Sequence, residues 1–179
     1  MKEIEREIKV LNIDLSEFEK RLIKLGAKYL GQEYQENIVI ENETDSIEKN
    51  LNAYLRIRTT EKKNLDSRSS EFTLKKIIKD KEFKTAEEIT TSISDKDKLL
   101  EILENLGFHI KYRGYKNRKS YLYKSARIDL DIWDKDTYPY PYAEIEFTNS
   151  KEKENILKEL AINPKDIVLD TITELRRKL

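Results

Sequence analysis

Hydrophobic and polar residues alternate with a period of two through much of this chain, which indicates β-strands with two different faces. The pattern is already present at residues 3–10, where the odd positions hold three glutamates and Lys9, and the even positions hold Arg6 with Ile4, Ile8 and Val10. Three neighbouring carboxylates on one strand face repel one another. Such a face is either the solvated side of an edge strand or one wall of a site that holds a divalent cation or a group of basic side chains.

Similar alternation predicts further strands, which together with the first would form a mostly antiparallel sheet of seven or eight strands. The predicted strands are Tyr29–Ile40, Ala53–Thr59, Glu71–Lys79, Phe83–Ser92, Ile110–Lys124, Ala126–Trp133 and Tyr142–Thr148. Polar loops are expected over residues 41–50 and 62–70.

Apolar residues at helical spacing predict helices between and after these strands. The first helix begins after Asp14, a typical N-cap, and ends at Gly26; the second begins after Asp95 and ends at Gly107. Two more are expected, one around residues 156–160 and one from Ile167 to the C-terminus. The whole chain, residues 1–179, is therefore expected to form one α+β domain.

The composition restricts the chemistry. Of the 179 residues, 39% are charged, but the 35 basic and 35 acidic side chains balance. A net charge of zero argues against general binding of nucleic acid or of a membrane surface. The chain has no cysteine, which excludes thiolate metal sites and thiol nucleophiles, and its one histidine, His109, is too little for a histidine-rich zinc site. With no long apolar run and no signal-peptide pattern, a cytoplasmic protein is expected.

Charged residues on the predicted strands are sorted by sign. The acidic positions are Glu5, Glu7, Asp129, Asp131, Glu144 and Glu146, and the basic positions are Lys9, Arg56, Arg58, Lys75, Lys116 and Arg118. An open sheet covered by helices on one side could carry such a face in solvent. A sheet closed into a barrel would instead set an acidic wall against a basic wall inside it. That arrangement suits a polyanion bound together with divalent cations.

Several of these strands resemble the motifs of the CYTH superfamily, the triphosphate tunnel metalloenzymes. Residues 5–9 fit its ExExK signature. The later segments follow in the family's order: LRxR at residues 55–58, TxK at 73–75, KxR at 116–118, the strand with the metal-site aspartate at 128–131, and EIE at 144–146. The resemblance spans nearly the whole chain. It implies an α+β fold in which an eight-stranded antiparallel barrel with flanking helices binds a triphosphate with Mg²⁺ or Mn²⁺.

The resemblance also implies roles for individual residues. The triphosphate would be bound by Lys9, Arg56, Arg58, Lys75, Lys116 and Arg118. The metal ligands would be Glu5, Glu7, Asp131, Glu144 and Glu146. The residues expected to act in catalysis are Glu5, Glu7, Lys9 and Glu144.

Two segments depart from the family pattern. The RxExE strand that often follows TxK is replaced by residues 84–88, which keep Glu88 in phase but have Lys84 and Ala86 at the other two places. The glycine-rich turn before the last strand is replaced by residues 138–142, in which tyrosines and prolines alternate. These tyrosines and Trp133 either frame the mouth of the tunnel or pack on the core.

The function expected is metal-dependent hydrolysis of a small-molecule triphosphate such as tripolyphosphate, thiamine triphosphate or a nucleoside triphosphate, by a monomer or homodimer. A class IV adenylyl cyclase is the first alternative. Class IV cyclases resembling this chain can carry a His-Phe pair shortly before ExExK, and the four residues before Glu5 contain neither residue. A binding module that holds a polyphosphate without turning it over is the second alternative.

Overall fold

The fold is built around one long antiparallel sheet. The computed structural model describes residues 3–63, 67–78 and 80–179, with Glu3 described by its backbone alone. Within this part of the chain the strands are β1 (Glu3–Val10), β2 (Lys28–Glu41), β3 (Ala53–Lys62), β4 (Ser67–Ile78), β5 (Lys84–Ile93), β6 (His109–Tyr123), β7 (Ala126–Trp133), β8 (Tyr142–Phe147) and β9 (Ile167–Val168). The expected strand end at Lys79 and residues 64–66 of the expected loop lie outside the described residues.

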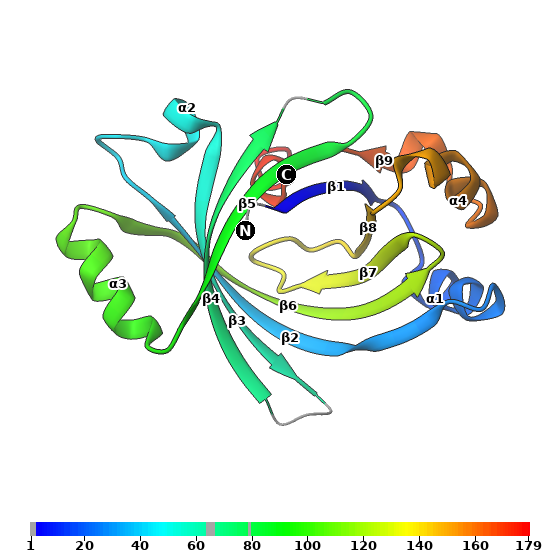
Figure 1. Cartoon of the computed structure of the whole chain (residues 1–179), viewed down its shortest axis with the longest axis horizontal. Helices are drawn as coiled ribbons and strands as arrows, with labels where there is room; N and C mark the ends of the chain where they lie inside the picture. The colour runs from blue at the N-terminus through cyan, green and yellow to red at the C-terminus, as the bar shows by residue number, and fades with distance from the viewer. Residues whose placement is uncertain (1–2, 64–66, 79) are drawn as a thin grey trace.

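The first strand closes the sheet into a barrel. The sheet runs in the order β5-β4-β3-β2-β6-β7-β8-β1, and β1 then pairs with β5 as well (Figure 1). One edge of β1 pairs with β8 over residues 7–10, and its other edge pairs with β5 over residues 3–7 and with β9 beyond. All of these pairings are antiparallel. The prediction of an eight-stranded antiparallel barrel is therefore confirmed, with β9 as one additional short strand.

The apolar faces of the strands point away from the barrel centre. Ile8, Ile128 and Ile145 are buried in one outer cluster that includes Phe18 and Leu22 of the first helix. A second outer cluster places Ile38, Ile40 and Ile57 of β2 and β3 against Leu103 of the third helix. Because strand side chains alternate between faces, burying the apolar face under helices leaves the charged face inside the barrel.

The helices are α1 (Leu15–Lys24), α2 (Ile47–Leu51), α3 (Lys96–Asn105), α4 (Lys153–Glu159) and α5 (Ile172–Arg176), with 3-10 turns at Ser150–Glu152 and Pro164–Asp166. Helices α1 and α4 lie at one end of the barrel and α3 lies at the other (Figure 1), whereas the start of α5 lines the cavity. Asp14 caps α1 and Asp95 caps α3, as predicted, and the positive φ angles of Gly26 and Gly107 end these helices. None of the helices in the described ranges has the length and apolar character needed to cross a bilayer.

Three predicted elements differ from the structure. The loop expected over residues 41–50 contains the start of α2, whose N-cap Ser46 accepts a hydrogen bond from the Lys49 amide. The helix expected from Ile167 begins only at Ile172, because residues 167–168 pair with β1 and Thr171 forms a capping box with Glu174. The polar residues 67–70, expected in a loop, extend β4 because they pair with β3. In each case strand pairing or helix capping sets the boundary of the element, and the pattern of apolar residues alone does not predict that boundary.

Candidate functional site

The barrel encloses a cavity of about 320 Å³ that is lined almost entirely by polar and charged side chains. Residues from all eight barrel strands contribute to it. Of the residues predicted to bind substrate or metal, those that line it are Glu5, Glu7, Lys9, Arg56, Arg58, Lys75, Lys116, Arg118, Glu144 and Glu146. Asp131 alone among the predicted site residues is not part of the lining. The closed barrel thus brings together residues that lie more than 130 positions apart in the sequence.

Two arginines on β3 line the cavity, and positive charge is in excess around Arg58. Among the described residues, neither Arg56 nor Arg58 makes an ion pair; Arg58 Nε donates a hydrogen bond to Asn37 Oδ1 over 2.9 Å. Burial, and then the positive charges of Arg56 and Arg118, lower the pKa of Arg58 to about 10. Desolvation and neighbouring positive charges both disfavour the charged form of Arg58. Burial also acts to lower the pKa of Arg56, but Tyr54, Glu88 and Glu5 outweigh it, so that pKa is raised. This wall of the cavity therefore favours an anion.

The opposite wall, on β1 and β8, is a network of alternating charges. Glu7 contacts the ammonium groups of Lys9, at 3.1 Å, and of Lys84. Lys9 also contacts Glu144 at 3.0 Å, and Glu144 reaches Arg118 at 3.1 Å. Burial and the charge of Glu144 act to raise the pKa of Glu7, but Lys84 and Lys9 outweigh them, so the pKa is lowered. These carboxylates are ionised and already neutralised by protein cations.

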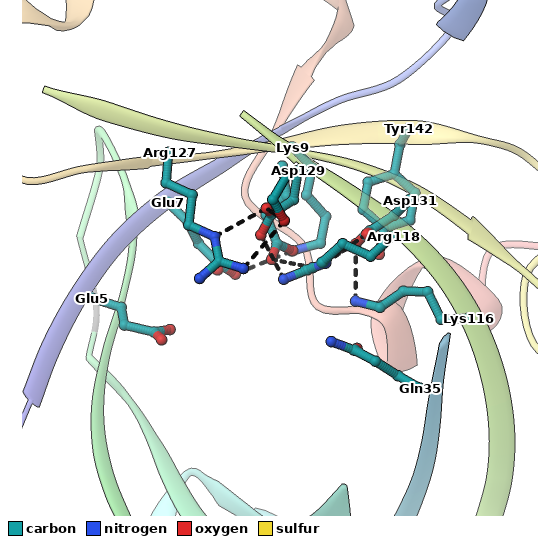
Figure 2. A network of polar contacts seen from close by, with 12 residues as sticks. Glu5, Glu7, Lys9, Gln35, Lys116, Arg118, Arg127, Asp129, Asp131 and Tyr142 are labelled. Carbon is teal, nitrogen blue, oxygen red and sulfur yellow. Dashed lines mark hydrogen bonds and ion pairs between the residues drawn. The ribbon is translucent and has the colours of Figure 1, made fainter. Parts of the chain in front are cut away.

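Asp131 lies behind the cavity wall. Its carboxylate is fully buried and accepts hydrogen bonds from Lys116 at 2.9 Å and, in bidentate fashion, from Arg118 at 2.7 and 2.6 Å. The ammonium group of Lys116 and the guanidinium group of Arg118 both point toward the Asp131 carboxylate (Figure 2). Asp131 shares the inner face of β7 with Asp129, but only Asp129 is part of the cavity lining, because Lys116 and Arg118 cover Asp131. Asp131 holds Lys116 and Arg118 in place, and its predicted metal role stays a prediction.

Two carboxylates of the cavity lack sufficient positive charge nearby. Glu146 makes no ion pair within the described part of the chain, and burial followed by the charge of Glu5 raises its pKa to about 7, against the opposing effect of Arg127. Burial also raises the pKa of Glu5, although Lys75 contacts it. Lys75 is shared with Glu88, at 2.5 Å, so it neutralises neither acid completely. A divalent cation near Glu5 and Glu146 would supply the missing charge.

The donor set fits Mg²⁺ or Mn²⁺ bound together with phosphate. Both ions prefer oxygen ligands, and Mg²⁺ is commonly held by one or two carboxylates, several waters and substrate phosphates. Glu5 and Glu146 supply that number of carboxylates. In the residues that the structure describes, no group of three or more acidic or imidazole side chains could hold an ion unaided. The oxygens of Glu7, Asp131 and Glu144 face cations instead, so we expect metal binding to depend on the anion.

The sequence pattern does not assign a role to several of the residues that line the cavity. Lys84 and Glu88 both line the cavity, so β5 contributes to it despite its departure from the family pattern. The buried amides of Gln35 and Asn37 also line it. Neutral amides carry no charge, so sorting the strand residues by the sign of their charge does not identify them. Alternation along β2 was the one available signal, since residues 33, 35, 37 and 39 share the inner face.

Some of the aromatic residues before β8 line the cavity, and others pack in an apolar cluster with α5. Trp133 and Tyr142 line the cavity, and Trp133 Nε1 donates a hydrogen bond to the Tyr142 hydroxyl over 2.8 Å. Tyr138 and Tyr142 are buried against Leu175 of α5. Tyr140 is exposed. This segment therefore packs α5 against the barrel while presenting one aromatic pair to the cavity.

Comparison with known proteins agrees with this geometry. The sequence matches the CYTH domain over residues 1–177. A Methanocaldococcus jannaschii protein, named as a candidate adenylate cyclase, is 33% identical, and the match covers 97% of this chain and 98% of that protein. The structure superposes on a Pyrococcus horikoshii protein with a TM-score of 0.80 at 25% identity, covering 97% and 98% of the two chains. A Hippeastrum candidate adenylyl cyclase, described as having a dominant triphosphatase activity, gives a TM-score of 0.69 at 16% identity and covers 99% of this chain and 96% of its own.

Proposed function

The chain belongs to the CYTH domain family, and from this premise we propose that it is a divalent-metal-dependent triphosphatase. The substrate class is a small-molecule triphosphate: tripolyphosphate, thiamine triphosphate or a nucleoside triphosphate. The phosphate chain lies in the barrel cavity, and water attacks its terminal phosphorus. Adenylyl cyclase activity, which would attack the α-phosphorus of ATP with the ribose 3′-hydroxyl, is the alternative.

The observation that carries this proposal is a pair of cavity-lining arginines, Arg56 and Arg58, that make no ion pair among the described residues. A guanidinium group without a carboxylate partner in a partly enclosed cavity is costly to keep charged unless an anion is bound. Guanidinium forks bind phosphate oxygens in bidentate fashion. A cavity of about 320 Å³ with cations on several strands matches a chain of phosphates better than a single phosphate.

The neighbouring residues divide the remaining tasks. Arg56, Arg58 and Lys75 bind the phosphate chain from β3 and β4, while Lys116 and Arg118 bind it from β6, with Lys9 close by. When bound, Mg²⁺ or Mn²⁺ at Glu5 and Glu146 neutralises phosphate charge and lowers the barrier to attack. Glu7 and Glu144 hold Lys9 in a fixed position through their ion pairs. Fixing the cations before substrate arrives avoids reorganisation during the reaction.

The names of the relatives include both reactions, so they do not decide between them. The Methanocaldococcus jannaschii protein is named for cyclase activity, whereas the Hippeastrum protein combines a cyclase name with a described triphosphatase activity. A hydrolase needs only water in line with the terminal phosphorus, and a cyclase must also orient ribose and base. The charged side chains of the cavity support binding of the triphosphate, which both reactions require, and the smaller geometric demand of hydrolysis favours the triphosphatase.

A product assay on purified protein separates the two reactions. Tripolyphosphate, thiamine triphosphate and ATP are each incubated with Mg²⁺ and with Mn²⁺, and orthophosphate and cyclic AMP are quantified. We expect orthophosphate release from at least one substrate and no cyclic AMP. Cyclic AMP formed from ATP faster than orthophosphate would overturn the proposal in favour of the cyclase, and no turnover of any substrate would favour a binding module.

A further inference from the structure

Two neutral amides on β2 are buried in the wall of the charged cavity. Gln35 and Asn37 are 1% and 2% exposed, and they share the inner face of the strand. Each has one polar atom without a hydrogen-bond partner among the described residues: Oε1 of Gln35 and Nδ2 of Asn37. A buried polar atom without a partner is destabilising, because it has given up its hydrogen bonds to water without replacing them. Both atoms therefore indicate a ligand group that completes them.

The orientation of each amide is fixed by a charged neighbour. Gln35 Nε2 donates to the Glu33 carboxylate over 2.5 Å, and a carboxylate can only accept. Asn37 Oδ1 accepts from Arg58, and a guanidinium can only donate. Turning either amide over would place like groups against each other. The unpartnered atoms are consequently an acceptor at Gln35 and a donor at Asn37.

These two atoms require different ligand groups. An ionised triphosphate presents acceptor oxygens, which suit the Asn37 donor and the surrounding cations. It offers no hydrogen to the Gln35 acceptor. Gln35 needs an O–H or N–H group, and water is the reactant of a hydrolase that supplies one. In register, Gln35 lies opposite Lys116, and both side chains point into the same interior space as Glu5 (Figure 2).

We propose that Gln35 Oε1 binds and orients the attacking water, while Asn37 Nδ2 donates to a phosphate oxygen. In the step this assists, the water oxygen forms a bond to the terminal phosphorus of tripolyphosphate. The bond from that phosphorus to its bridging oxygen breaks, and its electron pair leaves with pyrophosphate. The water becomes part of hydrogen phosphate and releases one proton to solvent. This inference rests on the proposed triphosphatase function.

Substitution of Gln35 tests the inference through steady-state kinetics. Gln35→Met keeps the side chain's length but removes its acceptor, so we expect kcat for tripolyphosphate with Mg²⁺ to fall roughly tenfold or more. Affinity for imidotriphosphate, a non-hydrolysable analogue measured by calorimetry, should change less than threefold. Gln32→Met is the matched control, since it makes the same chemical change on the same strand outside the cavity lining, and its kcat should equal that of wild type.

A second variant guards against loss of folding. Gln35→Asn keeps an amide but withdraws its oxygen from the cavity, and it should also lower kcat while leaving the affinity for imidotriphosphate intact. If both Gln35 variants keep the wild-type kcat, or if they lose affinity and kcat in parallel, the assignment of Gln35 is wrong. A wild-type protein that releases no orthophosphate overturns the proposed function, and with it the inference. A hydrolase insensitive to Gln35 overturns the inference alone.

Discussion

Arg56 and Arg58 differ from the buried basic side chains of the cavity in having no carboxylate partner within the described residues. Lys9, Lys75, Lys84, Lys116 and Arg118 are all held by acidic groups. An ion pair offsets part of the cost of burying a cation, whereas a part-buried cation without a partner keeps that cost. Arg58, whose pKa is lowered, should therefore show opposite effects on stability and on ligand affinity.

Replacing Arg58 by methionine should separate these two effects. Because burial and neighbouring cations lower the Arg58 pKa to about 10, its charged form is disfavoured in the folded protein. Arg58→Met should raise the free energy of unfolding without ligand by no more than about 1 kcal/mol, because losing the hydrogen bond to Asn37 offsets part of the gain. It should raise the KM for tripolyphosphate at least tenfold. Urea unfolding and initial-rate kinetics measure the two quantities.

The control for Arg58→Met is Arg68→Met, which removes an arginine that is exposed on β4. Its unfolding free energy and KM should both stay close to those of wild type, because a surface ion pair contributes little. Unchanged KM in Arg58→Met would contradict the assignment of this arginine to the phosphate chain.

At the scale of elements, the connection between β7 and β8 determines how β8 and α5 meet the cavity. Asp134 begins this connection: its carboxylate accepts hydrogen bonds from the amides of Tyr115, at 2.7 Å, and Thr137, at 2.8 Å. Gly114 lies directly beneath Thr137, and a Cβ atom there would come within 2.9 Å of its methyl group. The turn is thus pinned to β6 by both charge and close packing.

Asp134→Asn should lower stability in a pH-dependent way. Burial acts to raise the pKa of Asp134, but hydrogen bonds from Tyr115 and Thr137 outweigh it and lower the pKa. A carboxyl whose pKa is lowered by folding adds stability above its unfolded pKa, near 4, and that stability is lost as the pH falls through the folded value. Asp134→Asn should therefore cost about 1–2 kcal/mol at pH 7 and much less at pH 2.5.

Chemical unfolding at the two pH values measures this difference. Asp136→Asn, in the same turn but exposed, should cost little at either pH. An equal loss at pH 7 and pH 2.5 in Asp134→Asn would mean that the carboxylate charge is not what holds the turn.

The sequence was sufficient to predict the strands and their charged faces, because alternation and the order of signs are local properties that the fold preserves. The closed barrel followed from the resemblance to the CYTH motifs, since the pattern alone also allowed an open sheet. The sequence was insufficient where a contact between distant residues determines a boundary or the position of a side chain. Asp131 and Asp129 share a strand face, and which of them meets the cavity depends on the position of Arg118. The boundary at Ile167 depends on pairing with β1. Gln35 is identified as a candidate ligand-binding residue only from the structure, in which its hydrogen bond to Glu33 fixes the orientation of its amide.

At the scale of the whole molecule, the barrel reverses the usual arrangement of polarity. Its apolar faces are buried under α1, α3 and α4, and its interior holds cations and carboxylates in unequal balance from wall to wall. Arg58 has an excess of positive charge around it, and the acids at Glu5 and Glu146 lack positive charge. A triphosphate and a divalent cation together would neutralise both regions, and each should strengthen binding of the other.

Calorimetric titration of tripolyphosphate, with Mg²⁺ and with EDTA, tests this central claim most directly. To prevent turnover, imidotriphosphate replaces the substrate in a parallel titration. We predict one binding site per chain, an affinity at least tenfold higher with Mg²⁺ than with EDTA, and weak binding of Mg²⁺ alone. Equal affinity with and without Mg²⁺, or no binding in either condition, would contradict the account of a charged barrel built for a metal-bound triphosphate.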